Sequence, residues 1–180
     1  MERNLIFTHI PKTGGTTFRY LLERQYGTEH TRVLDGDEAA QAFRNQSPEA
    51  RQPVRLLMGH MFTGLHTALS GPTDYVTFLR HPVQRILSYY AHVHNEKDNP
   101  LHEAVTQHQI GLYDFVQQLD WGNINNTQIR FISGIKDTEE AMLAKAMENI
   151  ERDYPVVGIL ERFEESLVAM KHHFGWDISH

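Results

Sequence analysis

A strand, a glycine-containing turn and the start of a helix follow one another between Leu5 and Phe18, and this stretch constrains the fold more than any other. The apolar residues Leu5 to Phe7 predict a buried strand, and Pro-Lys-Thr-Gly-Gly-Thr-Thr, from Pro11 to Thr17, predicts a turn into a helix. The first N–H groups of a helix lack partners within it, and the helix dipole favours negative charge at that end. We therefore interpret this turn as a loop that binds a phosphate or a similar anion.

The residue types within the loop have different expected roles. Gly14 and Gly15 let the backbone approach a ligand closely, and Lys12 adds a mobile positive charge. Thr16 and Thr17 can cap the helix and donate hydroxyl hydrogen bonds. In the ordinary nucleoside-triphosphate loop the lysine follows the last glycine, whereas Lys12 precedes both glycines here. We therefore expect Lys12 to reach the ligand from the strand side.

Apolar runs alternate with helical patterns along the rest of the chain. This alternation predicts an α/β fold with a P-loop-type parallel sheet of about four to five strands, flanked by helices on both faces. Ligands of such sheets bind at the carboxyl ends of the strands. Because His60 and Arg80 follow two predicted strands, we expect them beside the loop. The further strands are predicted at residues 54–58, 75–79 and 156–160, the main helices at residues 37–45, 82–90, 137–151 and 161–174, and a mobile excursion at residues 95–111.

Composition limits the class of protein and its partners. The length of 180 residues predicts a single domain, residues 1–180. Cysteine is absent, which excludes disulfides and thiolate ligands. No apolar run approaches the roughly 18 residues that cross a bilayer, and the early strand leaves no room for a signal peptide. We expect a cytoplasmic protein, or a soluble catalytic domain excised from a longer anchored protein.

Net charge bears on the kind of ligand. The chain has a net charge of −6, and its lysines and arginines are scattered along the sequence. Proteins that hold nucleic acid or another long polyanion usually carry a basic excess. The composition therefore argues against a nucleic-acid partner and favours a neutral or small ligand.

A second motif is RHPVQRILSYY, from Arg80 to Tyr90. Arg80 leaves a predicted strand just before a helix, and its planar guanidinium suits bidentate contact with a phosphate. Ser88 lies under two turns into that helix, so its hydroxyl can bind the same group. Taken in isolation, a surface arginine and a solvated serine explain the pattern better than a binding site does.

Both motifs resemble those of sulfotransferases. HIPKTGGTTF, from His9 to Phe18, is similar to the 5′-phosphosulfate loop of carbohydrate O-sulfotransferases of the heparan sulfate 2-O and 6-O type and their bacterial relatives. The Arg80 to Tyr90 segment resembles the 3′-phosphate motif of the same family. The resemblance implies the donor 3′-phosphoadenosine-5′-phosphosulfate (PAPS), its product 3′-phosphoadenosine-5′-phosphate (PAP), and no metal. The donor-binding residues that it implies are Lys12, Thr13, Gly14, Gly15, Thr16, Thr17, Arg80 and Ser88.

Sulfation of a hydroxyl requires a base, and histidine titrates in the right range. Gly59-His60 is similar to the Gly-His that carries the base in the 2-O relatives, so we expect His60 to be catalytic. His66 is a competitor, because Gly64-Leu65-His66 resembles the 6-O group. Lys12 is expected to stabilise the charge that develops on the bridging oxygen as the sulfuryl group leaves.

Two further features stay open at this stage. Asn125 to Phe131 resembles the Asn-x-Gln-x-Arg segment of the family, and within it Gln128 and Arg130 could equally face the acceptor or pair inside the fold. Family members usually continue past the last helix into a segment that helps close over the nucleotide. Because the sequence stops at His180, we expect a shortened chain or a pocket that is open on one side.

The favoured hypothesis is therefore a PAPS-dependent O-sulfotransferase that modifies a hydroxyl of a carbohydrate or small molecule by in-line transfer. One alternative is a P-loop kinase that uses ATP–Mg²⁺, although no predicted strand ends in the aspartate that such enzymes need. Another is a non-catalytic nucleotide-binding module of the same fold. The acceptor is expected to be selected by the polar residues 28–53 and 91–125.

Overall fold

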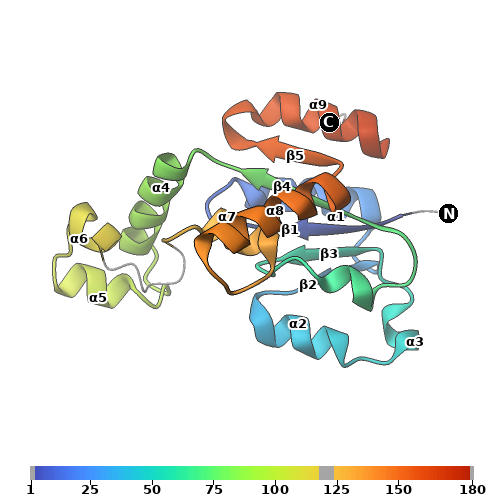
Figure 1. Cartoon of the computed structure of the whole chain (residues 1–180), viewed down its shortest axis with the longest axis horizontal. Coiled ribbons are helices and arrows are strands. Elements are labelled where there is room, and N and C mark those ends of the chain that lie inside the picture. The colour runs from blue at the N-terminus through green and yellow to red at the C-terminus, as the bar shows by residue number, and fades with distance from the viewer. Residues whose placement is uncertain (1–2, 118–123, 179–180) are drawn as a thin grey trace.

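The computed structural model describes residues 3–117 and 124–178 (Figure 1). The predicted domain ends, residues 1 and 180, and part of the segment 91–125 lie outside these ranges. The strands are β1 (Asn4–Thr8), β2 (Thr31–Val33), β3 (Leu56–Gly59), β4 (Thr73–Leu79) and β5 (Val156–Ile159). The α-helices are α1 (Gly15–Tyr26), α2 (Gly36–Arg44), α3 (Pro48–Arg51), α4 (Pro82–Asn95), α5 (His102–Gln107), α6 (Leu112–Gln117), α7 (Thr127–Ser133), α8 (Glu139–Asp153) and α9 (Phe163–Phe174), with short 3₁₀ helices η1 (Leu65–Ala68) and η2 (Leu160–Arg162).

The five strands form one sheet in the order β2-β3-β1-β4-β5, and every pairing is parallel. This arrangement confirms the predicted α/β fold. Strand β2 was not predicted, because only three residues pair there, within a polar stretch, and they pair with β3 alone. Strand β1 lies in the centre of the sheet, with β3 and β2 on one side of it and β4 and β5 on the other. In open parallel sheets, ligands bind at the carboxyl ends of strands at such a switch point.

Separate hydrophobic cores cover the two faces of the sheet, because successive residues of a strand point to opposite faces. From β1, Ile6 packs into one core with side chains of α2, α7 and α8. Leu5 and Phe7 pack into the other core with side chains of α1 and α9. Figure 1 shows the helices on either side of the strands, as predicted.

A third hydrophobic cluster lies outside the sheet, in a small unit made by α4, α5 and α6 at the left of Figure 1. Tyr89 and Val93 of α4, Val105 of α5 and Phe115 of α6 are buried there. Residues 95–111, predicted as a mobile excursion, therefore contain the helix α5, whose Val105 is fully buried in this cluster, with Leu101 and Ile110 packed against it. Hereafter we call residues 82–117 the α4–α6 unit.

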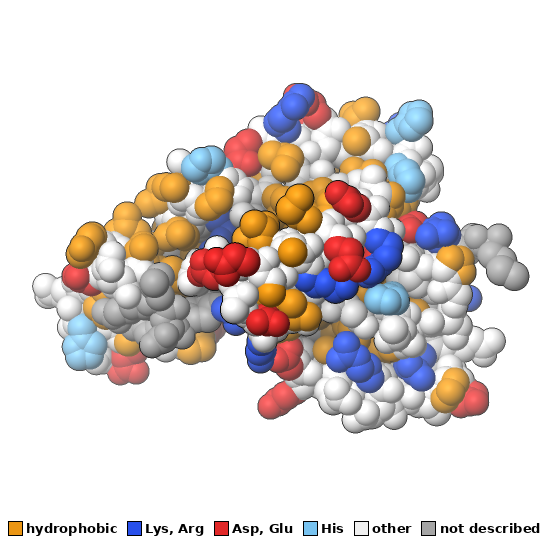
Figure 2. Space-filling model, viewed as in Figure 1, with side chains coloured by type: hydrophobic (Ala, Val, Ile, Leu, Met, Phe, Trp, Pro, Cys, Tyr) orange, Lys and Arg blue, Asp and Glu red, His pale blue; other side chains and the backbone are white. Residues whose placement is uncertain are grey.

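The surface agrees with the scattered charge of the sequence. Figure 2 shows hydrophobic side chains over the α4–α6 unit, whereas acidic and basic side chains are interspersed over the right-hand part of the same face. Within the described ranges, none of the helices combines the length and the apolar character needed to cross a lipid bilayer.

Candidate active site

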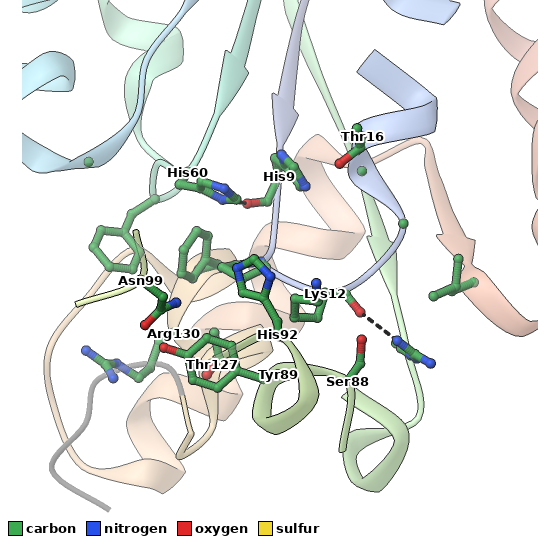
Figure 3. Close-up of a pocket in the computed structure, with 18 of the residues that line it drawn as sticks. His9, Lys12, Thr16, His60, Ser88, Tyr89, His92, Asn99, Thr127 and Arg130 are labelled. Atoms are coloured by element: carbon green, nitrogen blue, oxygen red, sulfur yellow. Dashed lines mark hydrogen bonds between the residues drawn. The ribbon is translucent and has the colours of Figure 1, made fainter. Parts of the chain in front are cut away.

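A cavity of about 890 Å³ lies where β1, β3 and β4 end, a volume within the usual range for small-molecule sites. The loop after β1 contributes Lys12, and the residue after β3 is His60 (Figure 3). The residue after β4, Arg80, lines the same cavity. The structure thus brings together the three features that the sequence placed at separate strand ends. The other side of the cavity is lined by the α4–α6 unit and α7.

The loop between β1 and α1, residues 9–14, is predicted to bind the donor and is called the donor loop below. It bends through two residues with left-handed backbone, Lys12 with φ 69° and Gly14 with φ 82°. Gly14 is the N-cap of α1, and no side chain caps this helix. The predicted capping by Thr16 and Thr17 is therefore wrong, because the helix already begins at Gly15 and both threonines lie in its first turn. Thr16 lines the cavity, whereas Thr17 is not among the described lining residues.

Thr13 holds the loop from within. Its hydroxyl is buried and donates a hydrogen bond of 2.8 Å to the carbonyl of Ile10. The side chain of Thr13 therefore stabilises the turn. Any contact of this residue with a ligand would come from its backbone N–H group.

His9 packs tightly against the start of α1. A Cβ atom placed on Gly15 would lie 2.0 Å from Cδ2 of His9, so only glycine fits at this position. The His9 ring stacks on Phe7 and also lies beside the ring of His60, with centroids 4.3 Å apart. Burial, with smaller effects of the neighbouring His60 and Arg19, lowers the pKa of His9 to about 3. The imidazole of His9 is therefore neutral at physiological pH.

His60 is oriented by two hydrogen bonds. Its Nδ1 donates to the backbone carbonyl of His9 at 2.7 Å, and its backbone N–H donates to Oδ1 of Asp35 at 3.0 Å. The competitor His66 is not among the described residues that line the cavity. Its Nδ1 lies 2.9 Å from the hydroxyl of Tyr75, which also accepts the backbone N–H of His66 at 3.1 Å. The two candidate bases thus occupy different surroundings, and His60 is the one at the cavity.

Arg80 is held by contacts on two sides. Its backbone N–H donates to Oε1 of Gln128 at 2.8 Å, and Nε2 of Gln128 donates to the Arg80 carbonyl at 2.9 Å. Nη1 of Arg80 donates to the carbonyl of Lys12 at 3.2 Å (dashed line in Figure 3). Gln128 therefore acts inside the fold, whereas Arg130, its neighbour in the motif, lines the cavity.

Electrostatics at the loop favour an anion. Lys12 and Arg80 both line the cavity. Burial lowers the pKa of Lys12 below its ordinary value of 10.5, and the nearby charge of Arg80 lowers it further, while Glu96 acts in the opposite direction. A bound anion would relieve the repulsion between the two cations and favour the charged form of Lys12.

Several lining residues were not predicted. His92 and Asn99, from the α4–α6 unit, line the cavity together with the predicted Ser88 (Figure 3). The position of His92 could have been inferred, because residues four apart in a helix share a face and His92 lies one turn after Ser88. Burial and the charge of Lys12 lower the pKa of His92, an effect that Glu96 partly offsets. Asn99 carried no comparable signal, since it lies in an irregular segment after α4.

A five-stranded parallel sheet flanked by helices, whose central strand leads through a glycine-containing loop into a helix, defines a P-loop-like α/β fold. The chain belongs to the sulfotransferase family, because the profile described as Sulfotransferase family matches residues 1–176. The family prediction is thereby confirmed at the level of the sulfotransferases as a whole. No curated protein sequence matches the chain.

Solved structures that share the fold include two sulfotransferases. Mouse sulfotransferase SULT7A1, crystallised in complex with PAP, has a TM-score of 0.57 and 13% sequence identity, and the match covers 100% of this chain and 60% of the mouse chain. A sulfotransferase from Alicyclobacillus acidocaldarius has a TM-score of 0.54 and 12% identity, and the match covers 100% of this chain and 83% of the other. The present chain thus spans about three-fifths of the mouse enzyme.

Proposed function

We propose that this protein is a PAPS-dependent O-sulfotransferase that transfers the sulfuryl group to a hydroxyl of a carbohydrate or small-molecule acceptor. One observation carries the proposal. Lys12, Arg80 and His60 line the same cavity, and each follows a different strand of the parallel sheet. Membership of the sulfotransferase family and the PAP bound to the mouse relative support the same donor.

The donor would lie across the ends of β1 and β4. Lys12 and the backbone N–H groups at the start of α1 would bind the 5′-phosphosulfate, as helix N-termini bind anions. Arg80 and Ser88 would bind the 3′-phosphate that distinguishes PAPS from ordinary nucleotides. Both of these side chains line the cavity, as the proposal requires.

The reaction follows from the same residues. His60 would accept the proton of the acceptor hydroxyl while the acceptor oxygen forms a bond to sulfur. The bond between sulfur and the bridging oxygen breaks in line, and its electron pair stays on the 5′-phosphate of PAP. Lys12 would stabilise the charge that develops on that oxygen. The lysine and the loop amides supply this stabilisation, so the proposal requires no metal.

The proposal places the acceptor beside two aromatic rings that line the cavity. Phe62 and Phe131 both line the cavity, and their ring centroids lie 4.9 Å apart. Arg130 adds a basic group beside them. Aromatic surfaces with a few polar groups are typical of small-molecule pockets, which supports a compact hydroxyl compound or a sugar unit as the acceptor.

A calorimetric titration with PAP tests the proposal, with 5′-AMP and ATP–Mg²⁺ as controls. We expect selective binding of PAP, lost in Arg80→Ala. A preference for ATP–Mg²⁺ would overturn the proposal in favour of a kinase. Binding of PAP without turnover of PAPS across a broad panel of hydroxyl acceptors would instead identify a non-catalytic nucleotide-binding module.

A further inference from the structure

The side-chain amide of Gln128 makes two hydrogen bonds to the backbone of one residue, Arg80, at 2.8 and 2.9 Å. Arg80 lies one residue beyond β4, where the ladder of the sheet has ended. Partly buried backbone groups at such a point need partners from elsewhere in the fold. The amide of Gln128 supplies both a donor and an acceptor, as a neighbouring strand would.

The series of hydrogen bonds continues from Arg80 into the donor loop. Nη1 of Arg80 donates to the carbonyl of Lys12, whose backbone is left-handed with φ 69°. A residue other than glycine rarely adopts this conformation, and it persists only where the surroundings hold it. Gln128, Arg80 and Lys12 therefore form a series of hydrogen bonds from α7 to the loop that binds the anion.

Further contacts anchor the turn that follows Arg80 and the helix start that carries Gln128. On the β4–α4 turn, the backbone N–H of His81 donates to Oε1 of Glu161 at 2.9 Å. At the start of α7, Nη2 of the buried Arg85 donates to the Thr127 hydroxyl and to the Ile124 carbonyl, each at 3.1 Å. Gln128 thus projects from a helix start that is itself tied to α4.

We propose that Gln128 is a positioning residue for donor recognition, which holds Arg80 so that its guanidinium contacts the Lys12 carbonyl and the 3′-phosphate together. The inference rests on the proposed function, because it takes the 3′-phosphate of PAP as the ligand of Arg80. Gln128 is not among the described residues that line the cavity, so it acts through Arg80. Its loss should therefore reduce selectivity for the 3′-phosphate rather than nucleotide binding in general.

Titration of Gln128→Met with PAP and with 5′-AMP separates these effects, because methionine keeps the length of the side chain and removes both hydrogen bonds. We expect the Kd for PAP to rise about tenfold, as the loss of two partly buried hydrogen bonds predicts, while the Kd for 5′-AMP changes by less than about twofold. Gln107→Met is the matched control. That glutamine is exposed on α5 and donates to Glu103, and its replacement should change neither Kd.

A double-mutant cycle tests whether Gln128 acts through Arg80. Gln128→Met combined with Arg80→Ala should bind PAP no more weakly than Arg80→Ala alone, because residues of one network are not additive. Three outcomes would each overturn the inference without affecting the proposed function. They are additive losses in the double mutant, an unchanged Kd for PAP in Gln128→Met, and equal weakening of the binding of PAP and 5′-AMP.

Misfolding of the variant and failure of the proposed function can both be distinguished from failure of the inference. If Gln128→Met does not fold, as judged by thermal denaturation, Gln128→Glu serves in its place, because the carboxylate can still accept from the Arg80 N–H but cannot donate to its carbonyl. The same loss of 3′-phosphate selectivity is expected. If the unaltered protein binds PAP no better than 5′-AMP, the proposed function is wrong and the inference falls with it.

Discussion

The backbone carbonyl oxygen of His9 lies 2.7 Å from Nδ1 of His60. Because a carbonyl can only accept a hydrogen bond, Nδ1 carries the proton, and the lone pair of the neutral ring lies on Nε2. The segment that leads into the donor loop thus also selects the tautomer of the proposed base. Asp35, which accepts the backbone N–H of His60, fixes the same residue from the β2 side of the sheet.

Replacement of His60 by alanine should lower kcat by about 10²–10⁴-fold, because the acceptor hydroxyl would lose its base. The measurement is the release of PAP from PAPS with a hydroxyl acceptor that the unaltered protein turns over. His66→Gln is the comparison, and we expect it to retain most of the activity, since His66 contacts Tyr75. Near-normal turnover by His60→Ala, together with a large loss in the His66 variant, would transfer the role of base to His66.

The activity should fall at alkaline pH as Lys12 loses its proton. Burial and the charge of Arg80 lower the pKa of Lys12, so we expect kcat/KM for PAPS to decline as the pH rises through a value below the ordinary 10.5. The parameter kcat/KM reports ionisations of the free enzyme, where no donor phosphate restores the pKa. Lys12→Arg, which stays charged, should lack this decline. An identical alkaline profile in both proteins would show that Lys12 does not cause it.

His9 should make the protein less stable in acid. Burial and the neighbouring His60 hold its pKa at about 3 in the folded chain, against an ordinary 6.5. Between these pH values the unfolded chain binds a proton that the folded chain does not. The contribution of His9 to the free energy of unfolding is therefore complete above 6.5 and is lost as the pH falls toward 3.

Urea denaturation of His9→Phe at neutral pH and at about pH 5 tests this linkage. Phenylalanine keeps a flat ring beside Phe7 but does not titrate, so the decrease in unfolding free energy with acid should be smaller, by up to about 1.4 kcal/mol per pH unit. His172→Phe, at an exposed position of α9, should leave the decrease unchanged. The same pH dependence in His9→Phe and in the unaltered protein would contradict the prediction.

Local sequence signals were sufficient for the segments whose structure depends on near neighbours. The apolar run before Pro11, the paired glycines and Phe18 predicted β1, the donor loop and α1. The strands that become β3, β4 and β5 were predicted from their buried runs, with ends that differ by a few residues. The open choice for Gln128 and Arg130 could not be settled in this way, since both follow the same helical pattern.

Tertiary structure decided the features that depend on distant partners. Strand β2 is a strand only because Thr31 to Val33 pair with β3. The contacts that orient the site join residues far apart in sequence, with His60 and His9 separated by 51 positions and Gln128 and Arg80 by 48. The sequence alone therefore determined the glycine-containing loop after β1, the parallel α/β fold and the residue types that line the candidate site. Which of His60 and His66 reaches the cavity, and which side chain holds Arg80, depend on how separate elements pack. Propensity and periodicity act over a few residues, whereas these hydrogen bonds form only once the sheet and its helices have assembled.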